Sequence, residues 1–303
     1  MTTLTLPLSA RIASRPEFAG FAWGLTASVI WGAYLAFARS GVVGGLAPLD
    51  FVLLRYLTAG AIMLPLLLRF GLPTLGGIGW PRGLVLAALA GPAFILFGTL
   101  GYRWAPLAHG AVVQPAVVTI GTMALAVLLL RERIAATRWL GVGVLTLGLT
   151  LVAGAGWGTS DAWRGDLAFA AAGLLWAGFT IACRAWGVDP LRATAVVAVL
   201  GGVASVPLWR GFGDPSAMFA LGGRVLVTQA LVQGVLSGVV AVYAYGRAVA
   251  ALGAARAAIF AALVPVMAVI AGVPIAGEWP VGLQWPGLAI VLAGLSLAMG
   301  LLP

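Results

Sequence analysis

Long apolar runs recur along almost the whole chain and are separated by short segments that carry most of the charged residues. Each run is close to the ~20 residues that an α-helix needs to cross the hydrocarbon core of a bilayer. The runs are apolar on every side, unlike the alternating segments of about ten residues in a membrane β-barrel. The pattern predicts an all-α integral membrane protein with ten transmembrane helices. The ten runs are residues 18–38, 51–70, 83–102, 104–130, 139–160, 167–183, 193–209, 225–246, 257–277 and 279–303.

The composition supports a membrane protein and excludes other classes. Apolar residues make up 62% of the 303 residues, glycine adds 43 more, and charged residues are only 8%. A soluble domain carries about 25% charged residues, so this chain has too few to cover a water-exposed surface. A soluble globular enzyme, a disordered chain and a fibrous chain are therefore excluded.

The net charge of +9 comes from 17 basic residues, all of them arginine. Nucleic-acid binding would need these arginines clustered on a soluble face, whereas they stand singly or in pairs between apolar runs, so we expect no nucleic-acid partner. Their distribution instead predicts orientation, with both termini cytoplasmic. Eleven lie on the side of the N-terminus (Arg11, Arg15, Arg69, Arg82, Arg131, Arg133, Arg138, Arg184, Arg192, Arg247, Arg256), and five on the other side (Arg39, Arg103, Arg164, Arg210, Arg224).

The chain repeats itself at an interval of about 145 residues. Three groups of residues recur in order, each with a constant offset of 145, 142 or 146 residues. Gly20, Trp31 and Arg39 match Gly165, Trp176 and Arg184; Pro48, Gly60 and Pro65 match Pro190, Gly202 and Pro207; Glu132, Trp139, Gly141 and Gly148 match Glu278, Trp285, Gly287 and Gly294.

Each repeat contains five spans, and an odd number means that the second repeat crosses the membrane in the opposite sense. This is the inverted-repeat architecture of secondary transporters, whose binding site lies where the two halves meet. We expect a cytoplasmic N-terminus at 1–17, a first repeat at 18–156, a linker at 157–164 and a second, inverted repeat at 165–303.

Each repeat ends in the motif E-x6-W-x-G-x6-G, from Glu132 to Gly148 and from Glu278 to Gly294. With its two five-helix repeats, the chain resembles the EamA-type members of the drug/metabolite transporter superfamily. The resemblance implies ten helices, cytoplasmic termini and export of small metabolites. It is greatest to bacterial exporters of aromatic and other amino acids, which implies the bacterial inner membrane.

Three polar residues in the eighth run, Gln229, Gln233 and Ser237, share one helical stripe because they are four residues apart. Such a stripe is expected to face protein or water and not lipid. We interpret it as part of a substrate cavity, with helix packing through hydrogen bonds as the alternative.

His109 and Gln114 begin the fourth span. His109 is a candidate for binding a carboxylate or passing a proton, and the alternative is a histidine at the membrane interface. Gln114 lies deeper and is a candidate ligand contact, with a helix–helix hydrogen bond as the alternative.

Trp31 and Trp176 occupy equivalent positions in the two repeats, and Tyr34 and Thr180 share their respective faces. Inverted symmetry would place the two tryptophans on opposite sides of a central cavity, as apolar walls for a substrate. Packing in the core is the alternative.

Four residues are candidates for gates. Tyr102 and Trp104 lie at the end of the third span, where they form either an extracellular gate or an aromatic belt. Pro115 and Pro265 each remove a backbone hydrogen bond inside a span and are expected to bend it, either as a gate or as a static kink.

Arg55 is the charged residue that lies well within a span, and Asp50 precedes it by five residues. Arg55 is expected to attract a carboxylate, to hold the outer side closed, or to extend its guanidinium to the interface. No acidic residue lies deep in any run, which argues against both proton coupling and a cationic substrate.

These observations predict an amino-acid exporter that works by alternating access through a cavity between the repeats, without obligatory proton coupling. Export of lipophilic drugs or other metabolites is the alternative. An intramembrane enzyme is disfavoured because the chain has one histidine, one cysteine and no lysine. We therefore expect no cofactor and no metal; the sequence is compatible with a monomer.

Overall fold

The computed structural model describes residues 15–133, 135–154 and 161–299, and this part of the chain is helical, with no strand. Most of the predicted N-terminus at 1–17 and half of the predicted linker at 157–164 lie outside the described residues. The helices are α1 (Arg15–Val43), α2 (Pro48–Phe70), α3 (Trp80–Ala90), α4 (Pro92–Leu100), α5 (Leu107–Leu130), α6 (Ala136–Gly154), α7 (Ala162–Trp186), α8 (Pro190–Phe212), α9 (Pro215–Ala220), α10 (Gly223–Gln229), α11 (Ala241–Leu252), α12 (Ala254–Ala262), α13 (Val264–Ala276) and α14 (Gln284–Ala298), with 3-10 turns η2 (Leu72–Thr74) and η3 (Gly101–Arg103) and a π-helix η4 (Ala230–Val240).

Ten apolar segments in the described residues agree with the predicted ten spans. Eight are long enough to cross a membrane, and two shorter apolar helices, Ala136–Val152 and Gln284–Ala298, complete the set. The third span joins α3 and α4, the eighth joins α10, η4 and α11, and the ninth joins α12 and α13.

Proline has different effects in the two halves. Helix α5 continues through Pro115, whereas the ninth span divides into α12 and α13 next to Pro265. The third span also divides, at Gly91 and Pro92, a break that the apolar pattern did not predict. The halves therefore differ in where their helices are interrupted, as expected for proline, which lacks a backbone N–H.

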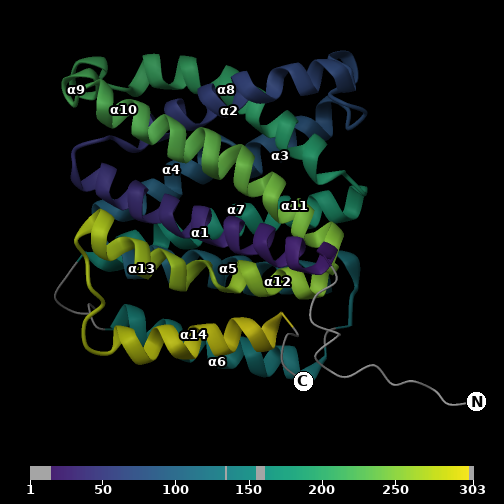
Figure 1. Cartoon of the computed structure of the whole chain (residues 1–303), viewed down its shortest axis with the longest axis vertical. Coiled ribbons are helices and arrows are strands. Elements are labelled where there is room, and N and C mark those ends of the chain that lie inside the picture. The colour runs from purple at the N-terminus through teal and green to yellow at the C-terminus, as the bar shows by residue number, and fades with distance from the viewer. Residues whose placement is uncertain (1–14, 134, 155–160, 300–303) are drawn as a thin grey trace, which may run out of the picture.

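The helices lie side by side in one bundle (Figure 1). Helices α2 and α8 pack together at one end of its long axis, and α6 and α14 at the other; between them α1 packs on α13 and α5 on α7. Every one of these pairs joins one helix from each half, and the α1–α13 pair is the counterpart of the α7–α5 pair. The contacts thus follow the inverted repeat.

Matched glycines of the repeat lie at the contacts between the halves. A Cβ added to Gly60 would lie 2.8 Å from the carbonyl oxygen of Ala198, and one added to Gly202 would lie 2.9 Å from that of Tyr56. In the α6–α14 pair, a Cβ on Gly148 would lie 2.7 Å from the backbone nitrogen of Val291. Small residues permit this close approach of helix backbones.

Gly148→Leu should separate α6 from α14 and destabilise the protein by about 1–3 kcal/mol, because the new side chain collides with backbone that cannot turn aside. Thermal unfolding in detergent measures the effect. Gly143→Leu is the matched control on the same helix, because nothing lies within 4 Å of its Cβ position. Equal melting temperatures for the two variants would contradict the close packing of α6 on α14.

Candidate functional site

Two opposite faces of the bundle, where helices begin and end, are distinct from the two ends of its long axis. The face called the Arg39 end carries the end of α1 and the start of α5. The face called the Arg184 end carries the end of α7 and the start of α8. A small cavity lies between α1, α4 and α5, with η3 contributing Tyr102. Its volume is about that of one water molecule. Its lining comprises Tyr34, Leu35, Ala38, Phe94, Ile95, Gly98, Thr99, Tyr102 and Gln114.

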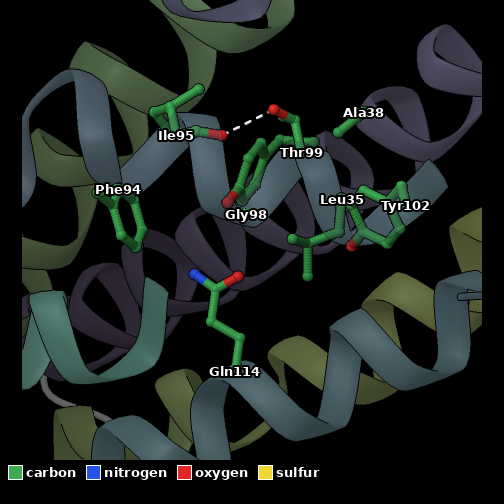
Figure 2. A pocket seen from close by; sticks show the side chains of 9 residues that line it. Leu35, Ala38, Phe94, Ile95, Gly98, Thr99, Tyr102 and Gln114 are labelled. Carbon is green, nitrogen blue, oxygen red and sulfur yellow. Dashed lines mark hydrogen bonds between the residues drawn. The ribbon is translucent and has the colours of Figure 1, made fainter. Parts of the chain in front are cut away.

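Gln114 contributes an amide to a lining whose other polar side chains, Tyr34, Thr99 and Tyr102, carry hydroxyls. Its side chain is 9% exposed and points from α5 into the cavity, toward α4 (Figure 2). The amide makes no hydrogen bond to a described residue, whereas the neighbouring hydroxyl of Thr99 donates to the carbonyl of Ile95 at 2.7 Å. A buried amide without a partner is unfavourable, so this group is suited to bind a polar ligand.

The rings of Tyr34, Phe94 and Tyr102 line the cavity, and further rings pack behind them. The Phe94 ring lies 4.9 Å from that of Trp176, which lies 5.1 Å from that of Phe179. On the other side, Tyr102 packs on Phe169 at 4.8 Å, and its buried hydroxyl has no partner in the described residues. Aromatic walls with a few polar groups are typical of small-molecule sites.

The polar stripe of the eighth span faces α1 and α2. Gln229 donates from Nε2 to the carbonyl of Phe37 at 2.8 Å, and Gln233 donates to that of Tyr34 at 3.4 Å. The Ser237 hydroxyl accepts from Arg55 Nη1 at 3.1 Å. These residues therefore hold helices together and do not line the cavity. Tyr34, whose carbonyl accepts from Gln233, does line it.

His109 is 2% exposed and lies in the first turn of α5, which begins at Leu107. Its Nδ1 lies 2.9 Å from Oδ1 of Asp166, which ties α5 to α7 away from the cavity lining. The apolar run at 167–183 left out an acidic residue that the helix includes. Helix α7 begins at Ala162, so Asp166 lies one turn inside it although it falls just outside the apolar run.

Each end of the bundle is closed by an arginine–glutamate pair. At the Arg39 end, Nε of Arg39 donates to Glu278, Nη1 donates to the carbonyl of Tyr102, and Glu278 accepts the N–H of Leu107 at 2.7 Å. At the Arg184 end, Arg184 donates to Glu132. The side chains of the first pair are 19% and 25% exposed and those of the second 48% and 40%. The two pairs consist of the same repeat positions, so inverted symmetry relates them.

Other predicted residues lie away from the cavity lining. Trp31 packs on Tyr245 at 5.4 Å, and Trp176 stands behind Phe94, so the two tryptophans do not face each other across the cavity. The hydroxyl of Thr180 donates to the carbonyl of Trp176 in its own helix.

The gate candidates are separated. Tyr102 is buried at the cavity and is not part of an aromatic belt, whereas Trp104 is exposed. Pro115 follows Gln114 in α5, and Pro265 is buried at the start of α13.

Asp50 is not the partner of Arg55: its carboxylate accepts from Nε1 of Trp209 at 2.7 Å and from the N–H of Ala47 at 2.8 Å.

Sequence reasoning missed Leu35, Phe94, Ile95 and Thr99 as lining residues. Nothing in an apolar run distinguishes a cavity-facing side chain from a lipid-facing one. Asp166 carried a usable signal, because it stands one turn inside a helix that begins after Asp161.

His109→Ala should destabilise the protein by about 3 kcal/mol, because it leaves the carboxylate of Asp166 buried without its partner. Thermal unfolding in detergent tests this, and adding Asp166→Ala to it should restore part of the loss. The control is Arg164→Ala, which removes an exposed pair with Asp161 and should cost less than about 1 kcal/mol. If both single variants melt alike, the buried pair is not formed in the membrane protein.

The chain was compared with known proteins. The EamA-like transporter family matches residues 18–154 and 163–300. Among curated proteins no match was found. A solved structure described as "Crystal structure of protein" is 19% identical, with 95% of this chain and 98% of that chain covered, and superposes with a TM-score of 0.62, which shows a shared fold. Because the family matches both halves, the chain belongs to the EamA-like transporter family.

Proposed function

We propose that this transporter exports amino acids, chiefly aromatic and other apolar ones, across the bacterial inner membrane. The observation that carries the proposal is the unpartnered amide of Gln114 inside a cavity walled by aromatic rings. Once the cavity widens beyond its present volume of about one water molecule, the rings would contact an apolar side chain, and the amide supplies both donors and an acceptor for polar groups.

The charge of the lining favours a zwitterion over an organic cation. The lining contains an amide, hydroxyls and rings, and no carboxylate. A cation in this low-dielectric space would lack a fixed counter-charge, whereas a zwitterion carries its own. Lipophilic drugs or other metabolites are the second candidate, and the aromatic walls favour an apolar member of that group.

The symmetry of the two ends supports alternating access. In the proposed orientation both termini are cytoplasmic, so the Arg39–Glu278 pair closes the outer side and the Arg184–Glu132 pair closes the inner side. Both pairs are formed and the cavity between them is small, which corresponds to an occluded arrangement. Opening one pair while the other holds would expose the cavity to one side at a time.

The cycle needs no proton in this proposal. The His109–Asp166 pair lies at the α5–α7 contact and neither residue lines the cavity, so it acts as a structural tie. The substrate gradient then drives movement. Uphill accumulation in liposomes driven only by an imposed pH gradient would contradict an uncoupled cycle.

Purified protein in liposomes should show saturable counterflow of labelled phenylalanine, accelerated by preloaded unlabelled aromatic and aliphatic amino acids. The panel includes every amino acid, a purine and a quaternary ammonium drug, and a channel or an enzyme would show no acceleration. If only the purine or the drug competes, the amino-acid proposal fails and the second candidate takes its place.

Gln114→Ala should raise KM for the transported amino acid by about 3- to 10-fold, the cost of one lost hydrogen bond to the substrate. Uptake kinetics in liposomes measure it. Thr99→Val is the matched control, because it changes a lining residue whose hydroxyl is already bonded within its own helix. An unchanged KM in Gln114→Ala would return this residue to helix packing.

A further inference from the structure

Arg55 lies well inside the membrane region. It follows the start of α2 at Pro48 by seven residues, which places it about 10 Å along the helix axis. A guanidinium at this depth is unfavourable unless a partner neutralises it, and such residues commonly mark a transported substrate's path.

Arg55 lacks an acidic partner within the described residues. Its Nη1 donates two hydrogen bonds, to the carbonyl of Gln233 at 3.0 Å and to the hydroxyl of Ser237 at 3.1 Å. The guanidinium carbon lies 5.6 Å from the centre of the Tyr34 ring and 6.0 Å from that of Tyr56. Rings and neutral oxygens stabilise the cation but leave its charge unbalanced.

The repeat shows that the fold does not need this arginine. The offset of 142 residues in these helices makes Val197 of α8 the counterpart of Arg55 in α2. Val197 is 7% exposed and packs as an apolar residue. An aliphatic side chain therefore suffices at this position of the α2–α8 pair, and the charge at Arg55 serves another purpose.

A second unsatisfied group lies beside it. The amide of Gln233 is fully buried, and its Nε2 lies 3.4 Å from the carbonyl oxygen of Tyr34 and 3.3 Å from Oε1 of Gln229. Both of these neighbours are acceptors, so the amide nitrogen must face them. Its oxygen is then left buried without a donor in the described part of the chain.

The backbone here is also unusual. Residues Ala230–Val240 form a π-helix, a conformation that is rare and concentrated at functional sites. Arg55 donates a hydrogen bond to a carbonyl within this π-helix. The Tyr34 ring, which lies next to the Arg55 guanidinium, is also one of the residues that line the cavity. Tyr34 therefore lies between the cavity and two groups that lack partners, the Arg55 guanidinium and the amide oxygen of Gln233.

We infer that Arg55 binds the carboxylate of the substrate and that the amide oxygen of Gln233 accepts a hydrogen bond from its ammonium group. The side chain of the substrate then occupies the cavity that Tyr34 lines, which must widen from its present volume of about one water molecule. Arginine suits this role because its remaining donors match the geometry of a carboxylate. This assignment deepens the proposed amino-acid transport and rests on it for the identity of the ammonium group.

The test uses three probes that share a phenylethyl group: phenylalanine, 3-phenylpropionate, which lacks the ammonium, and phenethylamine, which lacks the carboxylate. Their affinities for the purified full-length protein are measured by tryptophan fluorescence. Arg55→Met should weaken both carboxylates by about 10- to 100-fold, the loss of a charge-assisted hydrogen bond, and leave phenethylamine unchanged.

Arg192→Met is the matched control, because Arg192 also donates to a carbonyl, of Gly76, and lies over a ring, of Phe70, but stands away from the cavity. It should leave all three affinities unchanged. Arg55→Lys should retain part of the carboxylate affinity, and melting temperatures identify any variant that fails to fold.

Equal effects of Arg55→Met on all three probes, no effect on any, or no binding of either carboxylate to the unaltered protein would each overturn the assignment. Failure of the proposed function has a different signature. If 3-phenylpropionate binding depends on Arg55 but no amino acid gives counterflow, the amino-acid proposal fails and the carboxylate site stands. If Arg55→Met transports phenylalanine with unchanged KM, the site fails and amino-acid transport stands.

Discussion

In a bilayer every buried polar group must find its partner within the protein, and this constraint orders the structure. Most intramembrane charges described here obey it: Asp166 pairs with His109, and Asp50 accepts from Trp209. Among the described residues, buried oxygens without a partner occur on Tyr102, Thr122, Asp166 and Gln233. Two unbalanced groups lie close together next to Tyr34: Arg55 has no carboxylate, and the Gln233 oxygen has no donor. Gln114 lines the cavity that Tyr34 also lines and has no partner there. A transported substrate can supply what these groups lack and then leave, which a fixed partner cannot.

The two halves match each other where they close the bundle and differ where the proposed substrate site lies. Matched residues close both ends of the bundle, Arg39 with Glu278 and Arg184 with Glu132, so the two closures are built alike. A cycle between two such closures requires only that they open in turn. The substrate itself has no such symmetry, and the site differs accordingly: Arg55 has a valine as its counterpart, and the eighth span contains a π-helix where the third is broken at Gly91.

The ten spans and the inverted repeat followed from the sequence, because a hydropathy pattern is strong over twenty residues and repeated glutamates and glycines are easily matched. The glycines proved to lie where the halves touch, as at Gly148. The site was harder to predict. In a helix that is apolar on every side, a lining residue such as Phe94 resembles one that faces lipid. Polar residues were misleading in another way, since Gln229 binds a neighbouring helix and does not line the cavity.

In the proposed cycle, the two symmetry-related ion pairs close opposite sides of the bundle in turn. Ala38 is buried at the cavity on the Arg39 side, which faces outward in the proposed orientation. Ala38→Cys, combined with Cys183→Ala to remove the chain's single cysteine, therefore reports access from that side. The measurement is the rate at which an impermeant thiol reagent, added outside intact cells, modifies this cysteine. Adding Glu278→Gln should raise the rate by about tenfold, the effect of ~1.4 kcal/mol on the opening equilibrium, and Glu132→Gln should lower it. Equal rates in the two variants, or a faster rate in Glu132→Gln, would contradict the account.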